Sequence, residues 1–162
     1  MIQAIDAIAT ALLILKVGGL QDRGIKRITK MGQLELLNKD YPSIEISQNT
    51  TDDTLIGSNG NDDTFGIDII VRVRDIDKAG GDINVNEAGL EIVEIVEERD
   101  VDSKPLASTI FGILLDTFLY NDSFTLMSNL SVQYGTEDER GVIHKALIKV
   151  ILKGKTHFHY HN

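Results

Sequence analysis

The amino-acid sequence predicts an α+β fold in which two main helices pack on one face of a mostly antiparallel sheet. Apolar residues recur at helical spacing near the N-terminus and again between residues 105 and 120. Between and after these helices lie stretches of alternating apolar and polar residues, the pattern of half-buried strands. The length of 162 residues favours one domain, 1–162, with a substantial core. This order of elements is typical of helices layered on an antiparallel sheet.

The first expected element is an amphipathic helix at the N-terminus. Its apolar stripe comprises Ile2, Ile5, Ile8, Ala9, Leu12 and Leu15. Gly18 and Gly19 are expected to end the helix. The apolar run is shorter than the roughly 20 residues that span a bilayer, and Asp6 is atypical of a signal peptide. We therefore expect no membrane partner.

Three strands are expected in the next part of the chain. Residues 24–31 form an edge strand whose basic residues discourage pairing between edges. Residues 41–47 alternate isoleucine with polar residues, and Pro42 stands at the strand entry, where proline is tolerated. Residues 64–75 have the clearest alternation of the chain. The polar residues 49–63 between the last two strands are expected to form a projecting loop.

The second half predicts a further loop, a helix and a hairpin. Residues 76–89 are expected to project as a loop, and residues 90–103 favour helix slightly over strand. The next helix is expected to hold Pro105 in its first turn. Its apolar face comprises Leu106, Ile110, Phe111, Ile113, Leu114, Leu115 and Phe118. One strand over 123–135 and another over 142–155 complete the predicted hairpin.

Composition limits the possible functions. The net charge of −9 argues against a protein that grips nucleic acid, because such proteins carry basic patches. The chain contains no cysteine, and it lacks the sequence motifs of serine hydrolases, nucleotide-binding loops and dinucleotide-binding folds. His144 in a predicted strand is expected to be packed rather than catalytic. We predict no catalytic residue and no cofactor, and a small hydrolase using carboxylates ranks last among the alternatives.

Two stretches are similar to calcium-binding loops. Residues 57–65 resemble one calcium-binding nonapeptide with Asp62 as the ligand, but Asp63 is an extra residue and no second copy follows. Residues 82–93 resemble the start of an EF-hand loop, yet Glu87 and Val93 stand where that loop needs glycine and glutamate. We therefore expect no tight calcium site, and a small calcium- or metal-binding module is the alternative function.

The C-terminal tail, residues 155–162, has two possible uses. In an extended chain His157, His159 and His161 lie on one side, where three imidazoles could hold a divalent metal. Phe158 and Tyr160 lie together on the other side, and such an aromatic pair suits a partner surface. Metal binding by the histidines is the weaker hypothesis.

The order of elements resembles the tail terminator proteins of long-tailed bacteriophages, the lambda type. The resemblance rests on the stretches YPSIEIS and TFGIDIIVRVRD, the long apolar helix and the C-terminal hairpin, and it covers nearly the whole chain as a pattern. The chain departs from that pattern at residues 76–104 and in its longer tail.

The resemblance implies a structural protein of a virion tail, and that tail is assembled in the host cytoplasm. Members of the family form a ring, commonly a hexamer, that caps the tail-tube protein and joins the tail to the head-completion or connector protein. DNA would be only passing cargo in the lumen, where an acidic surface discourages sticking. The expected contact residues are Asp53, Leu55, Ile56 and Asn59 in the loop and Phe158 and Tyr160 in the tail.

Overall fold

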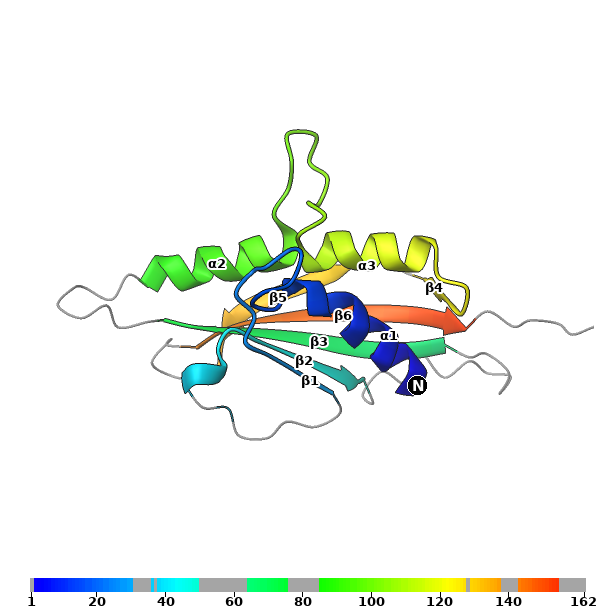
Figure 1. Ribbon diagram of the computed structural model, residues 1–162, viewed down its shortest axis with the longest axis horizontal. Helices are drawn as coiled ribbons and strands as arrows, with labels where there is room; N and C mark the ends of the chain where they lie inside the picture. The colour runs from blue at the N-terminus through cyan, green and yellow to red at the C-terminus, as the bar shows by residue number, and fades with distance from the viewer. Residues whose placement is uncertain are drawn as a thin grey trace, which may run out of the picture.

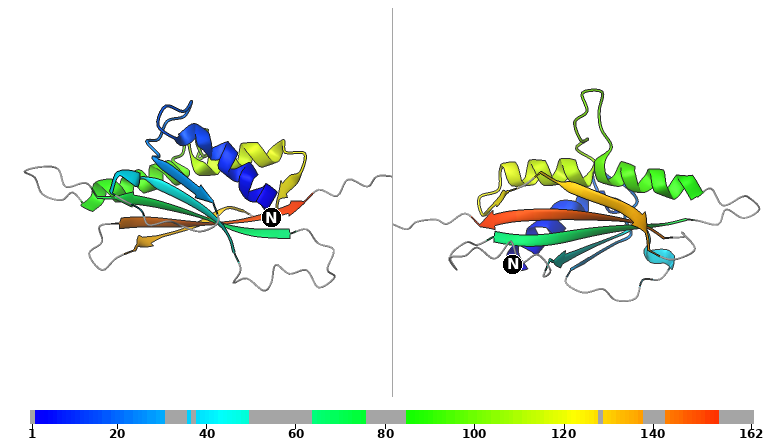
Figure 2. Two further views of the ribbon diagram at one scale, coloured as in Figure 1. Left: turned by 60° about the horizontal axis from the view of Figure 1, so that its bottom comes forward. Right: turned by 180° about the vertical axis from the view of Figure 1, so that it is seen from behind.

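A computed structural model describes residues 2–30, 36, 38–49, 64–75, 85–127, 129–137 and 143–154. Three α-helices, α1 (Ile2–Leu12), α2 (Val85–Glu97) and α3 (Ile110–Leu119), pack on one face of a six-stranded sheet (Figures 1 and 2). The strands are β1 (Arg27–Lys30), β2 (Ser43–Gln48), β3 (Thr64–Arg74), β4 (Phe124–Leu126), β5 (Ser131–Thr136) and β6 (Ile143–Gly154). Short 3-10 turns lie at Leu13–Leu15 and Asn38–Asp40. The predicted α+β class is confirmed, with α2 as a third helix.

The sheet has the order β1-β2-β3-β6-β4, and β5 also pairs with β6. Only the β1–β2 pair among the described strands is parallel, so the sheet is mostly antiparallel, as predicted. The long strands β3 and β6 run side by side over their full lengths, with Thr64 opposite Lys153 and Arg74 opposite Ile143. Strands β1 and β5 therefore lie toward opposite sides of the sheet.

The core lies between the helices and the facing side of the sheet. Alternate residues of β2, β3 and β6 are buried there because successive side chains of a strand point to opposite faces. These residues are Ile44, Ile46, Ile67, Ile69, Val71, Val73, Ala146, Ile148, Val150 and Leu152. The helices cover them with Ile5, Ile8 and Leu12 of α1, Ile92, Ile95 and Val96 of α2, and Ile110, Ile113, Leu114 and Phe118 of α3. The expected apolar stripe of the first helix is thus confirmed at its described side chains.

Helix α2 corrects the predicted loop over 76–89. The helix begins at Val85, so residues 85–89 are helical, and the rest of that loop lies outside the described residues. The sequence pattern placed the start of this helix too late because charged residues separate its apolar positions. Ala88, Ile92, Ile95 and Val96 nevertheless form one buried stripe at a spacing of three to four residues.

The start of α3 corrects the predicted place of Pro105. The helix begins at Ile110, and Thr109 caps it. Pro105 instead forms an isolated antiparallel bridge with Arg99. The Thr109 side chain accepts a hydrogen bond from the amide of Gly112, which favours a helix start at this point over one at Pro105.

The predicted strand over 123–135 is interrupted. Strand β4 pairs Leu126 with Leu152, whereas β5 pairs Ser131 with Lys149, so the chain between them carries two more residues than β6 does. The shift is even, and Val132 therefore stays on the same face of the sheet as Leu126. Met127, Asn129 and Leu130 of the interruption line a pocket with residues of α3.

None of the described helices has the length and apolar character needed to cross a membrane.

Candidate assembly surface

A projecting arm, residues 98–106, connects α2 with α3 and stands away from the body of the molecule (Figure 1). Its tip is held by Asp100, whose amide donates to the carbonyl of Lys104 at 2.9 Å. The Asp100 carboxylate also accepts from the amides of Asp102 at 2.8 Å and Lys104 at 3.0 Å. Val101 at the tip is fully exposed. The arm thus presents an apolar side chain on a hydrogen-bonded turn.

The return of the arm is packed tightly against α3. The Thr109 hydroxyl is buried, donates to the carbonyl of Leu106 at 2.7 Å and accepts from the amide of Gly112 at 3.0 Å. A Cβ at Gly112 would overlap the Leu106 carbonyl oxygen, so only glycine allows this approach. These contacts fix the direction in which the arm leaves the helix layer.

Arg23, from another part of the chain, holds the start of the arm beside the residues that follow it. Its guanidinium donates to the Glu98 carboxylate at 2.6 Å and to the Ser108 hydroxyl at 2.6 Å. It also donates to the Ser108 carbonyl at 2.9 Å. A planar guanidinium with several donors suits a clamp of this kind. The arm is therefore tied to the segment that follows α1.

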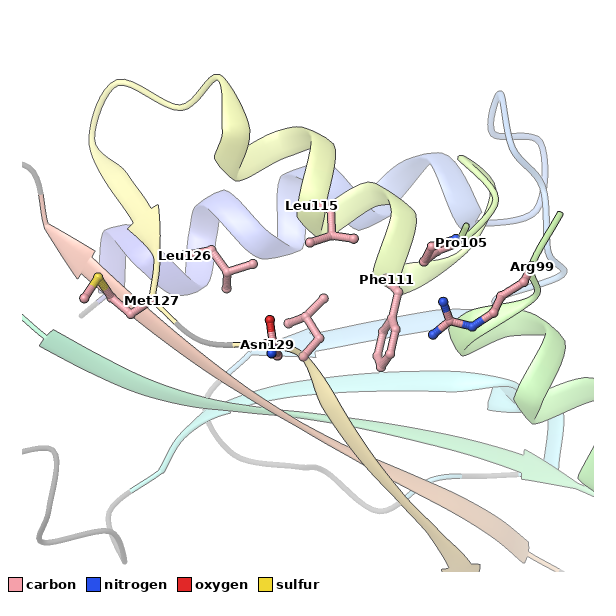
Figure 3. A pocket seen from close by; sticks show the side chains of 8 residues that line it. Arg99, Pro105, Phe111, Leu115, Leu126, Met127 and Asn129 are labelled. Atoms are coloured by element: carbon pink, nitrogen blue, oxygen red, sulfur yellow. The ribbon is translucent and has the colours of Figure 1, made fainter. Parts of the chain in front are cut away.

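A groove lined mostly by apolar residues, with Arg99 and Asn129 among its polar lining, lies at the base of the arm, between α3 and the interruption of β4 and β5 (Figure 3). Its volume is about 740 Å³, and it is lined by Arg99, Pro105, Phe111, Leu115, Leu126, Met127, Asn129 and Leu130. Phe111 is buried at its floor, whereas Leu115 and Met127 are 45% and 52% exposed. The expectation that Leu115 belongs to the core is thus wrong, because the interrupted strand leaves that side of α3 uncovered. Apolar side chains exposed together in this way are typical of contact surfaces.

Strand β5, the open edge, continues from the groove. It pairs with β6 on one side, and no other described strand pairs with it on the other. Its sequence, SVQYGT, contains no charged residue, and only Val132 is partly buried. Tyr134 is 42% exposed, yet partial desolvation of its phenol and the nearby carboxylate of Glu97 raise the pKa of that group. Among the described strands, none pairs with the backbone amides and carbonyls of β5 that face away from β6, so this side could accept another strand.

The far end of the open edge is anchored by an arginine on the sheet face that bears no described helix. Arg72 donates to Glu45 at 2.7 Å and to Glu137 at 2.9 Å, and its side chain is 9% exposed. Burial opposes the charge on Arg72, but the two carboxylates outweigh it and raise the pKa of the guanidinium. The cluster links β2 and β3 to the residue after β5.

His144 is packed, as predicted. Its Nε2 lies 3.3 Å from the Asp75 carboxylate, and both side chains are mostly buried. The imidazole also lies near Gly89 of α2, beside a smaller groove of about 320 Å³ that Tyr134 and Thr136 help to line. The pair joins the end of β3 to the start of β6 under α2, which is a structural role.

The candidate residues from the sequence lie outside the described residues. These are Asp53, Leu55, Ile56, Asn59, Asp62, His157, Phe158, His159, Tyr160 and His161. Strands β2 and β3 pair antiparallel up to Gln48 and Ile67, and the predicted projecting loop 49–63 between them lies outside the described residues except for Asn49. Within the described ranges, no group of three histidine, aspartate or glutamate side chains could hold a metal ion.

Sequence reasoning missed both the arm and the groove. The arm had a local signal in DVDSKP, since aspartate commonly closes a turn onto the backbone two residues on. The groove had none, because it arises where α3, the arm and the break between β4 and β5 meet. No protein-family model matches the chain, and a search of curated proteins finds no match either.

Proposed function

We propose that the chain is a structural protein of a bacteriophage tail that forms a ring, a hexamer by the family resemblance, and caps the tail tube. The ring would end tube polymerisation and then offer a surface to the head-completion or connector protein. DNA would pass through the lumen without binding. The proposal rests on the order of elements in the sequence and on the chemistry of the described surface.

The observation that carries the proposal is the gathering of contact features on one side of the molecule. The arm, the apolar groove and the open edge adjoin one another, whereas the β1 side of the sheet is short and basic. In the proposed ring this surface meets a different surface of the next copy, which is a heterologous contact. Such heterologous contacts close into rings when the rotation between copies divides a full turn.

The charge of the chain supports the same function. A net charge of −9 repels DNA at the surfaces that line a lumen. His144 and Arg72 are each held by carboxylates, which is a structural use of these two groups. These features suit a protein that contacts other proteins and lets DNA pass through its ring.

The proposal is tested by assembly with the cognate tail-tube protein. We expect the wild type to form rings in electron micrographs and to limit the length of tubes polymerised in its presence. Leu115→Glu should abolish both effects with the fold retained, because it places a charge in the groove at a partly exposed site. Leu90→Glu is the matched control, since Leu90 is an exposed leucine of α2 outside the groove lining.

Two outcomes would contradict the proposal. One is a wild type that remains monomeric with tube protein and leaves tube length uncontrolled. The other is equal activity of Leu115→Glu and the wild type, which would remove the groove from the assembly. Circular dichroism of both variants separates a loss of contact from a loss of fold.

A further inference from the structure

We propose that the open edge of β5 and the adjoining groove bind the C-terminal tail, residues 155–162, of a second copy of this chain. The tail would add as a strand beside β5, with Phe158 and Tyr160 directed to the groove. This inference deepens the proposed ring function and rests on it for the claim that the contact repeats around a ring. The tail-to-edge contact itself is argued from the described surface and from the sequence of the tail.

The open edge has the chemistry of a strand acceptor. Six residues, Ser131–Thr136, are paired on one side and contain no lysine, arginine, aspartate, glutamate or proline. Proteins commonly protect sheet edges with such residues, because an unprotected edge pairs with other chains. An added strand gains backbone hydrogen bonds from the edge and specificity from pockets beside it.

The groove supplies such a pocket at one end of the edge. Leu126 and Leu130 line it on either side of the strand break, and exposed Met127 stands at its rim. Phe111 lines it with an aromatic ring that extends from α3 toward the sheet (Figure 3). Methionine and aromatic surfaces adapt well to an inserted aromatic ring. The site therefore favours an extended segment that carries aromatic residues.

The tail has the matching pattern. Its sequence KTHFHYHN alternates histidine with Phe158 and Tyr160, so a strand would place both aromatic rings on one face. It contains no acidic side chain, whereas Glu97 lies beside Tyr134 of the open edge. It follows β6 directly, and β6 ends at Gly154.

Reach assigns the tail to a second copy rather than to its own chain. Gly154 lies opposite Phe124 at the start of β4, so a tail that turned back onto its own sheet edge would first have to pass β4. Passing β4 takes about 10 Å, or roughly three residues, at about 4.8 Å between strands and 3.3 Å per residue. Tyr160, six residues after Gly154, would then reach only about the level of Leu126. Its own tail could therefore approach Leu126 at the groove but would leave its own β5 uncovered, whereas a tail from a neighbouring copy meets no such limit.

The test uses two full-length variants that are defective in opposite ways. The edge variant, Ser131→Lys with Gln133→Lys, places charges on β5 and keeps the tail. The tail variant, Phe158→Ser with Tyr160→Ser, keeps the edge and loses both aromatic rings. Each variant alone should associate at least about tenfold more weakly than the wild type in analytical ultracentrifugation. The equimolar mixture should regain heterodimers, because the edge variant donates its tail to the intact edge of the tail variant.

A control and a second measurement keep the test specific. Thr29→Lys charges β1 instead of β5 and should associate as the wild type does. Because the chain has no cysteine, Gln133→Cys in one copy and His159→Cys in another should form a disulfide between copies. Thr29→Cys with His159→Cys should form about tenfold less, since effective concentration falls steeply when sites are not adjacent.

Several results would overturn the inference. Wild-type association by the tail variant would mean that β5 pairs with another β5 or with a different segment. Wild-type association by the edge variant would place the contact elsewhere. A mixture that stays monomeric, or a wild type that is monomeric at about 1 mM, would remove the tail-to-edge contact. If these results occur while tubes are still capped, the proposed function stands without the tail-to-edge contact. If the mixture of edge and tail variants forms heterodimers but the wild type does not cap tubes, the tail-to-edge contact stands and the proposed function is refuted.

Discussion

Strands β1 and β5 lie toward opposite sides of one sheet and differ in how they are protected. Strand β1 spans four residues, Arg27–Lys30, and both of its basic ends are paired with carboxylates. Arg27 lies 3.4 Å from Asp40, and Lys30 lies 2.8 Å from Asp6 of α1. Strand β5 spans six uncharged residues and has a groove and a projecting arm beside it.

The chain entering β1 is also covered by its own neighbours. Residues 16–25 fold over it, with Lys16 bridged to Ile25 and the amide of Val17 donating to the Ile25 carbonyl at 3.1 Å. The other edge has no equivalent among the described residues. Local contacts thus cover the chain that enters β1, whereas no described segment folds over β5 in this way. In the proposed ring, this difference between the two edges would give the contact a direction, as heterologous contacts need.

The largest expected effect comes from breaking the cluster that ties the two sides of the sheet together. Arg72→Ala leaves Glu45 and Glu137 without their shared guanidinium and should lower the free energy of unfolding by about 3 kcal/mol. Urea denaturation measures this loss, and amide hydrogen exchange should show faster opening of β5. Arg74→Ala, on the same strand and face, is the control and should change the free energy by less than about 1 kcal/mol. Equal losses of unfolding free energy for the two variants would refute the stabilising role of the Arg72 cluster with Glu45 and Glu137.

A smaller effect is expected where the arm meets α3. Alanine normally stabilises a helix relative to glycine by about 1 kcal/mol, yet Gly112→Ala should destabilise the protein by about 2 kcal/mol. The reason is the overlap of the new Cβ with the Leu106 carbonyl. Gly19→Ala is the counterpart near β1, where a Cβ would overlap the Ile14 carbonyl. Both variants should lower the melting temperature, but only Gly112→Ala should also weaken association, because it displaces the base of the arm.

The smallest effect concerns pH and the turn that covers β1. The Asp22 carboxylate accepts hydrogen bonds from the amides of Gly18 at 3.0 Å and Gly24 at 2.7 Å, and these bonds lower the pKa of Asp22. A lowered pKa means that the stabilisation is present above the ordinary value of 3.8 and is lost as pH falls through the lower folded value.

NMR titration of the Gly18 and Gly24 amides should follow this loss, while the amides of β5 stay unchanged. Asp22→Asn is the control, because its side-chain oxygen still accepts a hydrogen bond but does not titrate. Amide shifts that titrate equally in wild type and Asp22→Asn would contradict the assignment.

Much of the fold was predictable because it depends on local periodicity. The alternation in 64–75 and 142–155 corresponds to β3 and β6, and the helical spacing of 2–15 corresponds to α1 and its 3-10 extension. The strand over 123–135 was predicted as continuous because its alternation survives an even shift in register. Pro105 was misplaced because a proline fits both a first helical turn and the strand-like bridge that it forms with Arg99.

The sequence by itself determined the class of fold, the buried faces of the long elements, the acidic surface and the alternating tail. Each of these follows from spacing or composition, which act through neighbours along the chain. The tertiary structure alone decided which sheet edge is protected and where the apolar groove lies. Those properties arise from the junction of α3, the arm and the β4–β5 interruption. Arg23 reaches Glu98 and Ser108 across more than 70 residues of chain, and no local pattern encodes a contact between segments so far apart.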